Sequence, residues 1–174
     1  MRTEQHGGHD NREVAEPVAS RPRFPSGYGI HVDDAGLVPW SEAEGKLDAA
    51  RNYWIGTTRP DGSPHAMPVW GLWLDGSLYF SSGSASRKTR NLAVDPRIVV
   101  HLESGDDVVV LEGVARRVTD DAELLRVAEL YTAKYDFEFD PSSPDYPVFR
   151  VTPRRAYAWL ERDYPGTATR YAFT

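Results

Sequence analysis

Residues 79–92 read Tyr-Phe-Ser-Ser-Gly-Ser-Ala-Ser-Arg-Lys-Thr-Arg-Asn-Leu. This stretch predicts the end of a strand, a loop of small residues and the first turn of a helix. Tyr79 and Phe80 continue a β-type run, and residues 81–86 are small enough to let the backbone approach a ligand closely. Ser86 is the expected N-cap, because its hydroxyl can accept a hydrogen bond from an early helical N–H.

Three cations follow this N-cap: Arg87, Lys88 and Arg90. The helix dipole disfavours a cation at this end of a helix by roughly 0.3–1 kcal/mol each. An anion bound in the loop would reverse the sign of the local field and remove the conflict. The stretch therefore predicts an anion site, and a solvated basic helix end is the alternative.

The bulk composition narrows the class of protein. The chain has 174 residues, no cysteine and a formal charge of −6. The length suits a single domain, and the lack of cysteine excludes disulfides, thiolate nucleophiles and Cys-based metal sites. A net acidic chain does not attract nucleic acid, whereas a local basic pocket suits a small anionic ligand. No apolar run approaches the roughly 20 residues of a membrane span. We therefore expect a cytoplasmic protein without nucleic-acid or membrane partners.

The N-terminal part of the chain is polar and rich in Pro, Gly and charge. Residues 1–26 are expected to be a disordered extension, and residues 27–174 a single domain. Ser41 and Glu44 form a capping-box pattern, which predicts a helix from Ser41 to about Arg51.

Residues 52–82 predict a three-stranded meander that leads into the basic loop. Its strands are expected at 52–58, 64–74 and 77–82, with turns at 59–62 and 75–76. Pro68 cannot donate to a ladder, so the middle strand should lie at an edge or be bulged. Gly71 stands between Trp70 and Trp73 and is expected to leave room for something flat. The two tryptophans are either stacking surfaces for a ring or parts of the core.

The second half of the chain continues the β pattern. Asp95-Pro96 ends the short helix, and a longer helix begins near Asp120 with Leu124, Val127, Leu130 and Tyr131 on one stripe. Strands are expected at 98–103, 108–118, 148–152, 156–160 and 171–173, with a loop at 137–147. Hairpin-linked strands with few helices favour a mainly β fold, an antiparallel barrel.

Several motifs occur together in order. They are Trp54-Ile55-Gly56-Thr57-Thr58 with Asp61-Gly62-Ser63-Pro64-His65, then Pro68-Val69-Trp70, Tyr79-Phe80, Ser86-Arg87-Lys88-Thr89-Arg90-Asn91-Leu92 and Asp95-Pro96-Arg97. Together they resemble the flavin- and deazaflavin-binding split β-barrel family, which includes the pyridoxamine 5′-phosphate oxidases. The resemblance covers about residues 40–160.

The resemblance implies a homodimer with two cofactors held at the subunit interface. The strand from His65 to Trp70 would lie along the flavin-type ring and offer backbone groups to its polar edge. The loop and the start of the helix would hold the phosphate through Ser81, Ser82, Ser86, Arg87 and Lys88. The cofactor-binding residues implied are His65, Met67, Pro68, Val69, Trp70, Ser81, Ser82, Ser86, Arg87, Lys88 and Asn91.

One departure from the family separates its branches. Pyridoxamine phosphate oxidases carry an Arg and a Lys on the strand that here reads His65-Ala66-Met67-Pro68-Val69-Trp70. Neither an Arg nor a Lys is present on this strand, which argues against oxidase activity on pyridoxine phosphates. The sequence is closer to the branch that uses coenzyme F420, a deazaflavin with a phosphodiester and a polyglutamyl tail. Arg87, Lys88 and Arg90 suit such an extended anion. Flavin mononucleotide (FMN) is the alternative cofactor, because its phosphate would use the same loop.

The implied reaction is hydride transfer from a reduced deazaflavin to a small unsaturated organic substrate. The cofactor carries that chemistry, so no catalytic acid or base is assigned. His65 is either a proton or hydrogen-bond donor or a structural residue, and no His/Glu spacing suggests a metal site. Two other classes stay open: a non-catalytic binder of flavin, haem or bilin, and a structural dimer whose basic loop pairs with acidic residues of its partner.

Overall fold

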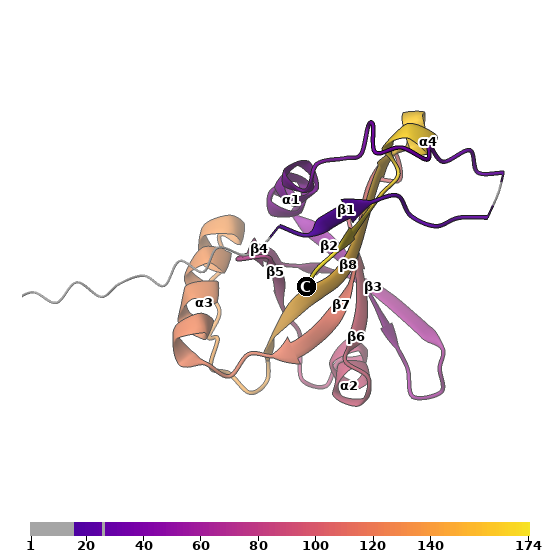
Figure 1. Cartoon of the computed structure of the whole chain (residues 1–174). Helices are drawn as coiled ribbons and strands as arrows, with labels where there is room; N and C mark the ends of the chain where they lie inside the picture. Colours follow the sequence, from indigo (N-terminus) through magenta and orange to yellow (C-terminus); the bar gives the residue numbers. More distant parts are fainter. Residues whose placement is uncertain (1–15, 26) are drawn as a thin grey trace, which may run out of the picture.

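The computed structural model describes residues 16–25 and 27–174. Within these residues, nine strands join in one sheet and four helices surround it (Figure 1). The strands are β1 (Val18–Ser20), β2 (Asn52–Thr58), β3 (Pro64–Trp70), β4 (Leu72–Leu74), β5 (Ser77–Ser81), β6 (Arg97–His101), β7 (Asp107–Arg117), β8 (Val148–Leu160) and β9 (Thr169–Ala172). The helices are α1 (Trp40–Ala49), α2 (Arg87–Val94), α3 (Asp121–Tyr135) and α4 (Tyr164–Thr167), and a 3-10 turn, η1, spans Glu161–Asp163.

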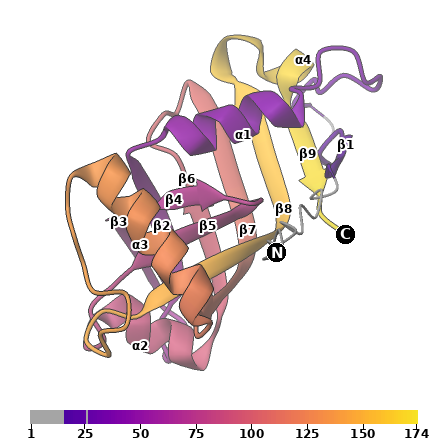
Figure 2. The ribbon, with the colours of Figure 1, turned by 90° about the vertical axis from the view of Figure 1, so that its left-hand side faces the viewer.

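The sheet curls into a barrel that is split along one side. Its main path runs β1-β9-β8-β7-β6-β2-β3, and every neighbouring pair is antiparallel. Strand β5 leaves this path and pairs with β4 and with the first half of β8, while β9 pairs with the second half. Figure 2 shows the long β7 and β8 with α1 and α3 in front of the strands. This architecture confirms the expected fold class, a mainly β antiparallel split barrel.

Strand β8 is continuous where the sequence predicted two short strands. Pro153 interrupts the apolar pattern, and the pairing with β7 shifts register between Glu112 and Gly113. A Cβ atom at Gly113 would lie 2.5 Å from the carbonyl oxygen of Thr152. Because Gly113 has no side chain, β7 can lie close to the backbone of Thr152 and Pro153 at this bulge. Strand β8 therefore keeps its pairing with β7 and continues to Leu160.

Strand β3 lies at the edge of the sheet, as Pro68 predicted. It pairs with β2 along its whole length and with no other described strand. The expected strand over residues 64–74 is broken at Gly71 into β3 and β4, and β5 pairs with β4 and β8 rather than with β3. The predicted three-stranded meander is therefore wrong, because the chain leaves the sheet path at Gly71.

The break at Gly71 is held by α3. The Tyr135 hydroxyl accepts from the Gly71 N–H at 2.9 Å and lies 2.7 Å from the Gly71 carbonyl, to which Lys134 Nζ also donates at 3.1 Å. A Cβ atom at Gly71 would lie 2.8 Å from the Tyr79 carbonyl oxygen. The expectation that Gly71 leaves room for a flat ligand is wrong, since the protein itself fills this space.

Helix α1 begins one residue earlier than its expected capping box. Pro39 occupies the N-cap position and makes no side-chain cap, so Ser41 lies inside the helix. The partner expected for the cap, Glu44, instead accepts a hydrogen bond from Trp73 Nε1 at 2.9 Å. Trp73 is buried against Trp40, which assigns it to the core. Tertiary packing overrides the local capping signal here.

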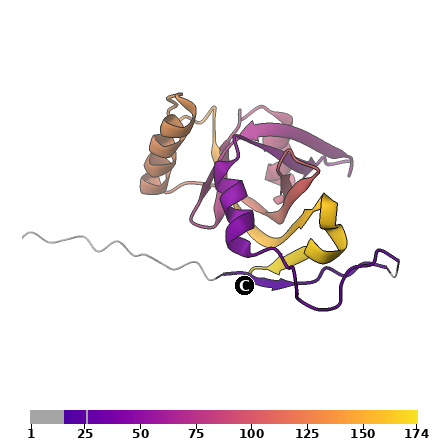
Figure 3. The same cartoon turned by 90° about the horizontal axis from the view of Figure 1, so that it is seen from above.

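The other two long helices start as predicted. Ser86 caps α2 and Asp120 caps α3, each accepting from the N–H three residues on. On α3 the expected stripe is buried except for Leu130, which is 40 % exposed, while Tyr135 joins the buried face. Figure 3 shows α1 and α3 as separate helices beside the barrel. No helix of the described residues is long and apolar enough to cross a membrane.

The N-terminal segment is structured over part of its length. Val18–Ser20 pair with β9, and Arg21 donates to the carbonyls of Asp33, Ala35, Gly166 and Ala168 at 2.6–3.0 Å. The extension expected to be disordered over residues 1–26 therefore includes strand β1, whose pairing depends on a distant strand. Residues 1–15 and 26 lie outside the described residues.

We predict that Tyr135→Phe destabilises the fold. The variant keeps the ring but leaves the Gly71 N–H without its partner at a buried position. A buried unsatisfied group costs about 1–3 kcal/mol in the free energy of unfolding, measurable by urea denaturation. Tyr146→Phe is the control, since this side chain is 60 % exposed. Equal stability of the two variants would contradict the role given to Tyr135.

Candidate functional site

The loop between β5 and α2 carries the expected serines. Ser86 Oγ accepts from the Thr89 N–H at 3.3 Å and lies 2.9 Å from Ser82 Oγ. Ser81 Oγ donates to the Tyr146 carbonyl at 3.0 Å, so its proton is engaged by a neighbouring loop. Ser82 and Ser86 are thus grouped at the start of α2, and Ser81 ties this group to the rest of the site.

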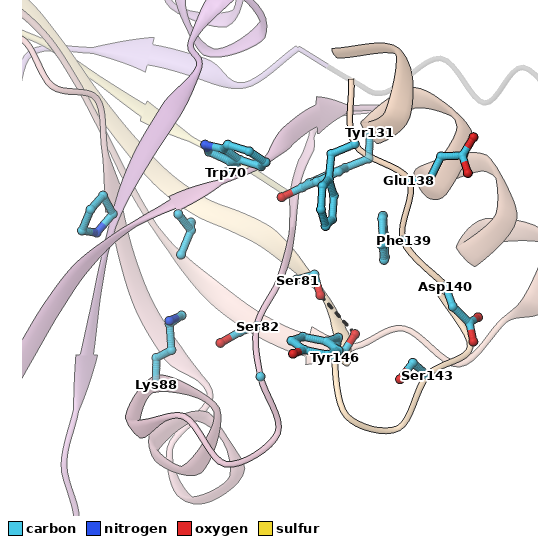
Figure 4. A pocket seen from close by; sticks show the side chains of 14 residues that line it. Trp70, Ser81, Ser82, Lys88, Tyr131, Glu138, Phe139, Asp140, Ser143 and Tyr146 are labelled. Atoms are coloured by element: carbon cyan, nitrogen blue, oxygen red, sulfur yellow. Dashed lines mark hydrogen bonds between the residues drawn. The ribbon is translucent and has the colours of Figure 1, made fainter. Parts of the chain in front are cut away.

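Lys88 is the half-buried cation of this stretch, whereas Arg87 and Arg90 are exposed. Its side chain is half-buried beside Ser82, and its ammonium points into the open space in Figure 4. None of the ion pairs among the described residues includes Lys88, and burial lowers its pKa. The first turn of α2 holds no acidic residue. A half-buried charge without a counter-ion at a helix N-terminus is an arrangement that an anion would stabilise, as the sequence predicted.

The remaining expected residues of α2 are placed differently from one another. Arg87 and Arg90 are exposed, so both reach solvent around the loop. Asn91 is fully buried and donates to Thr57 Oγ1 at 3.0 Å, while its Oδ1 has no hydrogen-bond partner. Asn91 thus links α2 to β2 through Thr57, and its direct contact with a cofactor stays a prediction.

A cavity of about 730 Å³ opens beside Lys88. Its walls come from β3, the β5–α2 loop, the end of α3 and the loop that follows α3. The lining residues are Pro68, Val69, Trp70, Ser81, Ser82, Gly83, Lys88, Tyr131, Phe137, Glu138, Phe139, Asp140, Ser143 and Tyr146. The structure thus brings six of the eleven expected site residues to one cavity.

His65 and Met67 belong to the same strand but do not line the cavity. Met67 is 46 % exposed at the sheet edge. His65 lies with its Nδ1 atom 3.5 Å from Thr57 Oγ1. Desolvation lowers the pKa of His65, and the positive charges of Arg59, Lys88 and Arg87 lower it further. The pKa of His65 is therefore expected to change when a nearby positive charge is removed or neutralised.

Trp70 is already stacked by the protein. Its ring lies 4.7 Å from that of Tyr135 at an interplanar angle of 7°, and the Arg51 guanidinium lies 5.4 Å from the centre of each ring. One face of Trp70 is thus covered, so Trp70 lines the cavity as an anchored side chain. Arg51 and Tyr135 had no local sequence signal for this role, because the contact joins segments far apart in the chain.

Four aromatic lining residues were not predicted: Tyr131, Phe137, Phe139 and Tyr146. The sequence placed Tyr131 on the buried stripe of a helix and the others in a plain connecting loop. That loop returns to the site, where the Ser84 N–H donates to the Asp145 carbonyl at 2.8 Å and the Ser82 N–H to that of Pro147 at 3.3 Å. Aromatic residues in a Pro- and Ser-containing loop were the available signal.

The comparisons with known proteins agree with this fold. The sequence model of the pyridoxamine 5′-phosphate oxidase family matches residues 40–160. Conserved hypothetical protein Rv2991 from Mycobacterium tuberculosis is 27% identical, with a TM-score of 0.64 over 74% of this chain and 88% of that one.

Two more distant structures share the fold. A structure described as an F420 reductase is 22% identical, with a TM-score of 0.52 over 65% of this chain and 94% of that one. The haem storage protein HutZ from Vibrio cholerae is 17% identical, with a TM-score of 0.53 over 66% and 87%. No curated protein matches the sequence.

We predict that the pKa of His65 depends on Lys88. Because the ammonium charge disfavours the imidazolium, Lys88→Gln should raise the pKa of His65, and inorganic phosphate bound at Lys88 should raise it in the wild type. Nuclear magnetic resonance titration of the imidazole measures both shifts. Arg126→Gln, at the distant pair with Asp75, is the control. An unchanged pKa in Lys88→Gln would mean that the lysine field does not reach the strand.

Proposed function

The chain belongs to the pyridoxamine 5′-phosphate oxidase family, and we propose that within it this protein is an F420-dependent oxidoreductase. It would bind the deazaflavin in the cavity beside Lys88 and reduce a small unsaturated organic substrate. When bound, the cofactor supplies a hydride; the second hydrogen that completes reduction of the double bond comes as a proton from solvent. The residues of the chain bind, orient and shield the reactants.

The observation that carries this proposal is the unpaired charge of Lys88. A half-buried ammonium without a carboxylate among the described residues is stabilised when an anionic group replaces its lost hydration. Ser86 Oγ caps the Thr89 N–H, which leaves the N–H groups of Arg87 and Lys88 in the first turn of α2 available to the same anion. The phosphate of the cofactor would lie there, with Ser82 and Ser86 beside it.

Strand β3 suits the ring of the cofactor. It is an edge strand, so backbone groups on its free side have no strand partner among the described residues. Pro68, Val69 and Trp70 bring this edge to the cavity. Free amide and carbonyl groups can hydrogen-bond the polar edge of a flavin-type ring, which would orient the ring along β3.

The deazaflavin is favoured over FMN by the charges around the site. No Lys or Arg stands on β3, and the exposed Arg87 and Arg90 flank Lys88, so the cations extend outward from the cavity. An anion longer than a single phosphate would use them. A structure described as an F420 reductase has the same fold, so the fold is compatible with this cofactor. FMN is the second candidate cofactor.

A non-catalytic binder is the second candidate function. The stacking of Trp70 on Tyr135 and the aromatic lining show that the protein fills part of the site with its own rings. A binder of flavin, haem or bilin needs no free volume for a second molecule, whereas a reductase does. The two functions therefore differ in whether a bound cofactor leaves room in the cavity.

We further propose a homodimer in the cytoplasm, with the cofactor at the subunit interface. The outer face of the sheet carries the stacked pair Trp54–His101, with ring centroids 6.2 Å apart. Val99, 40 % exposed, lies beside it on β6. An exposed sheet face that carries apolar side chains such as Trp54 and Val99 is suited to contact with a second copy of this chain.

The cofactor proposal predicts the outcome of fluorescence titrations at equal salt. Coenzyme F420 should bind more tightly than FMN, and Lys88→Gln should weaken F420 binding by about 10–100-fold, the value of a charged hydrogen bond. Lys88→Glu should abolish binding. Arg117→Glu, exposed on β7, is the matched control and should bind normally.

Each other outcome of these titrations has a definite meaning. Preference for FMN would move the protein to the flavin branch. Binding of neither cofactor, or normal binding by a folded Lys88→Glu variant, would overturn the proposed site.

The dimer proposal predicts a particle of twice the 19.5 kDa chain mass. Sedimentation or light scattering measures this directly, with and without coenzyme F420. A monomer under both conditions would refute the dimer and, with it, a cofactor site shared between subunits.

A further inference from the structure

The cavity has two unlike walls. One is formed by β3 and the β5–α2 loop and holds Lys88 with Ser82. The other is formed by α3 and the loop after it, and carries Tyr131, Phe139 and Tyr146 (Figure 4). The first wall accounts for the proposed cofactor, so the second is open to another role.

The second wall is aromatic and held in place. The rings of Tyr131 and Phe139 pack edge to face with centroids 5.1 Å apart, and Trp70 meets Tyr131 at 6.4 Å and Phe137 at 6.1 Å. Burial raises the pKa of Tyr131, so its hydroxyl is neutral at ordinary pH. The loop is tied to the first wall through the hydrogen bond from Ser81 to the Tyr146 carbonyl. Tyr131 is only 7 % exposed and supports Phe139 from behind, so the uncharged surface on which a ligand could stack comes from Phe137, Phe139 and Tyr146.

The charges of the lining restrict what can stack there. Lys88 is the single cation among the lining residues of the cavity. The same lining contains two carboxylates, those of Glu138 and Asp140. Figure 4 shows both carboxylates on the aromatic side, directed toward the outside of the cavity. When an anion occupies Lys88, the remaining formal charges of the lining are negative. Both carboxylates are exposed, so they repel a second anion mainly at the mouth of the cavity and with an energy that solvent reduces.

We propose that this aromatic wall is the substrate subsite, and that it accepts a flat conjugated molecule that is neutral or cationic and rejects phosphorylated and carboxylated molecules. As a substrate assignment it rests on the proposed function, whereas the ligand selectivity itself can be measured without the cofactor. It also separates this protein from oxidases of phosphorylated substrates. Those need a second anion site, and the cavity lining supplies no second cation.

Three matched probes test the selectivity: 2-naphthylmethanol, 2-naphthylmethylammonium and 2-naphthylmethyl phosphate. They share one ring system and differ in charge. Calorimetric titrations are run in phosphate buffer, so that inorganic phosphate screens Lys88, and repeated with Lys88→Gln. The neutral and cationic probes should bind at least about tenfold more tightly than the phosphate ester in both proteins.

Two sets of variants locate the selectivity. Phe139→Ala should weaken all three probes by roughly tenfold, because it removes a stacking ring. Glu138→Gln with Asp140→Asn should reduce the preference for the cation over the phosphate ester by at least about threefold, with the neutral probe unchanged. Glu103→Gln with Asp106→Asn, two exposed acids near the β6–β7 turn, is the matched control.

The outcomes separate this inference from the proposed function. Tighter binding of the phosphate ester, or probe affinities that ignore Phe139→Ala, would overturn the subsite. Correct selectivity in a protein that binds neither F420 nor FMN would leave the subsite standing and remove the reductase function. Binding of F420 or FMN together with tighter binding of the phosphate ester than of the neutral and cationic probes would leave the proposed cofactor site standing and remove the subsite.

Discussion

The split in the barrel depends on how the chain is held at Gly71. The hydroxyl of Tyr135 and the ammonium of Lys134 take both backbone groups of this residue, so β3 ends and β4 starts in a different direction. Because Pro68 gives no N–H, β3 is already unsuited to pair on both sides. Its edge therefore stays free. Helix α3, which makes this contact, also supplies the far wall of the cavity, so the same contact forms the edge and places a wall opposite it.

The electrostatics of the site follow from that geometry. Strand β5 pairs with β4 and β8, which directs its end toward the open side of β3. The cap formed by Ser86 then starts α2 at the cavity, and Lys88 reaches inward while Arg87 and Arg90 stay exposed. Asn91 fastens the helix to β2 through Thr57. A single inward lysine among outward arginines concentrates the need for an anion at one point, which a solvated basic helix end would not do.

The sequence predicted those features that depend on short-range chemistry. The cap at Ser86, the edge position of β3, the stop at Asp95-Pro96 and the fold class all rest on local geometry or on a family pattern. The errors share a different cause. Glu44 was assigned to a cap but bonds Trp73, and Gly71 was assigned to a ligand but bonds Tyr135. In each case a partner distant in sequence takes a group whose local role was equally reasonable, and one sequence contains no information on that choice.

The same reasoning explains why the loop after α3 was missed and why it matters. Its aromatic residues have no periodicity, and their arrangement depends on backbone hydrogen bonds to the β5–α2 loop. Those bonds join the wall that holds Lys88 to the aromatic wall, so neither wall is independent of the other. A second flat molecule that lies against a bound cofactor can use such an aromatic wall, so the proposed reductase function and the proposed substrate subsite depend on the same contacts between the two loops.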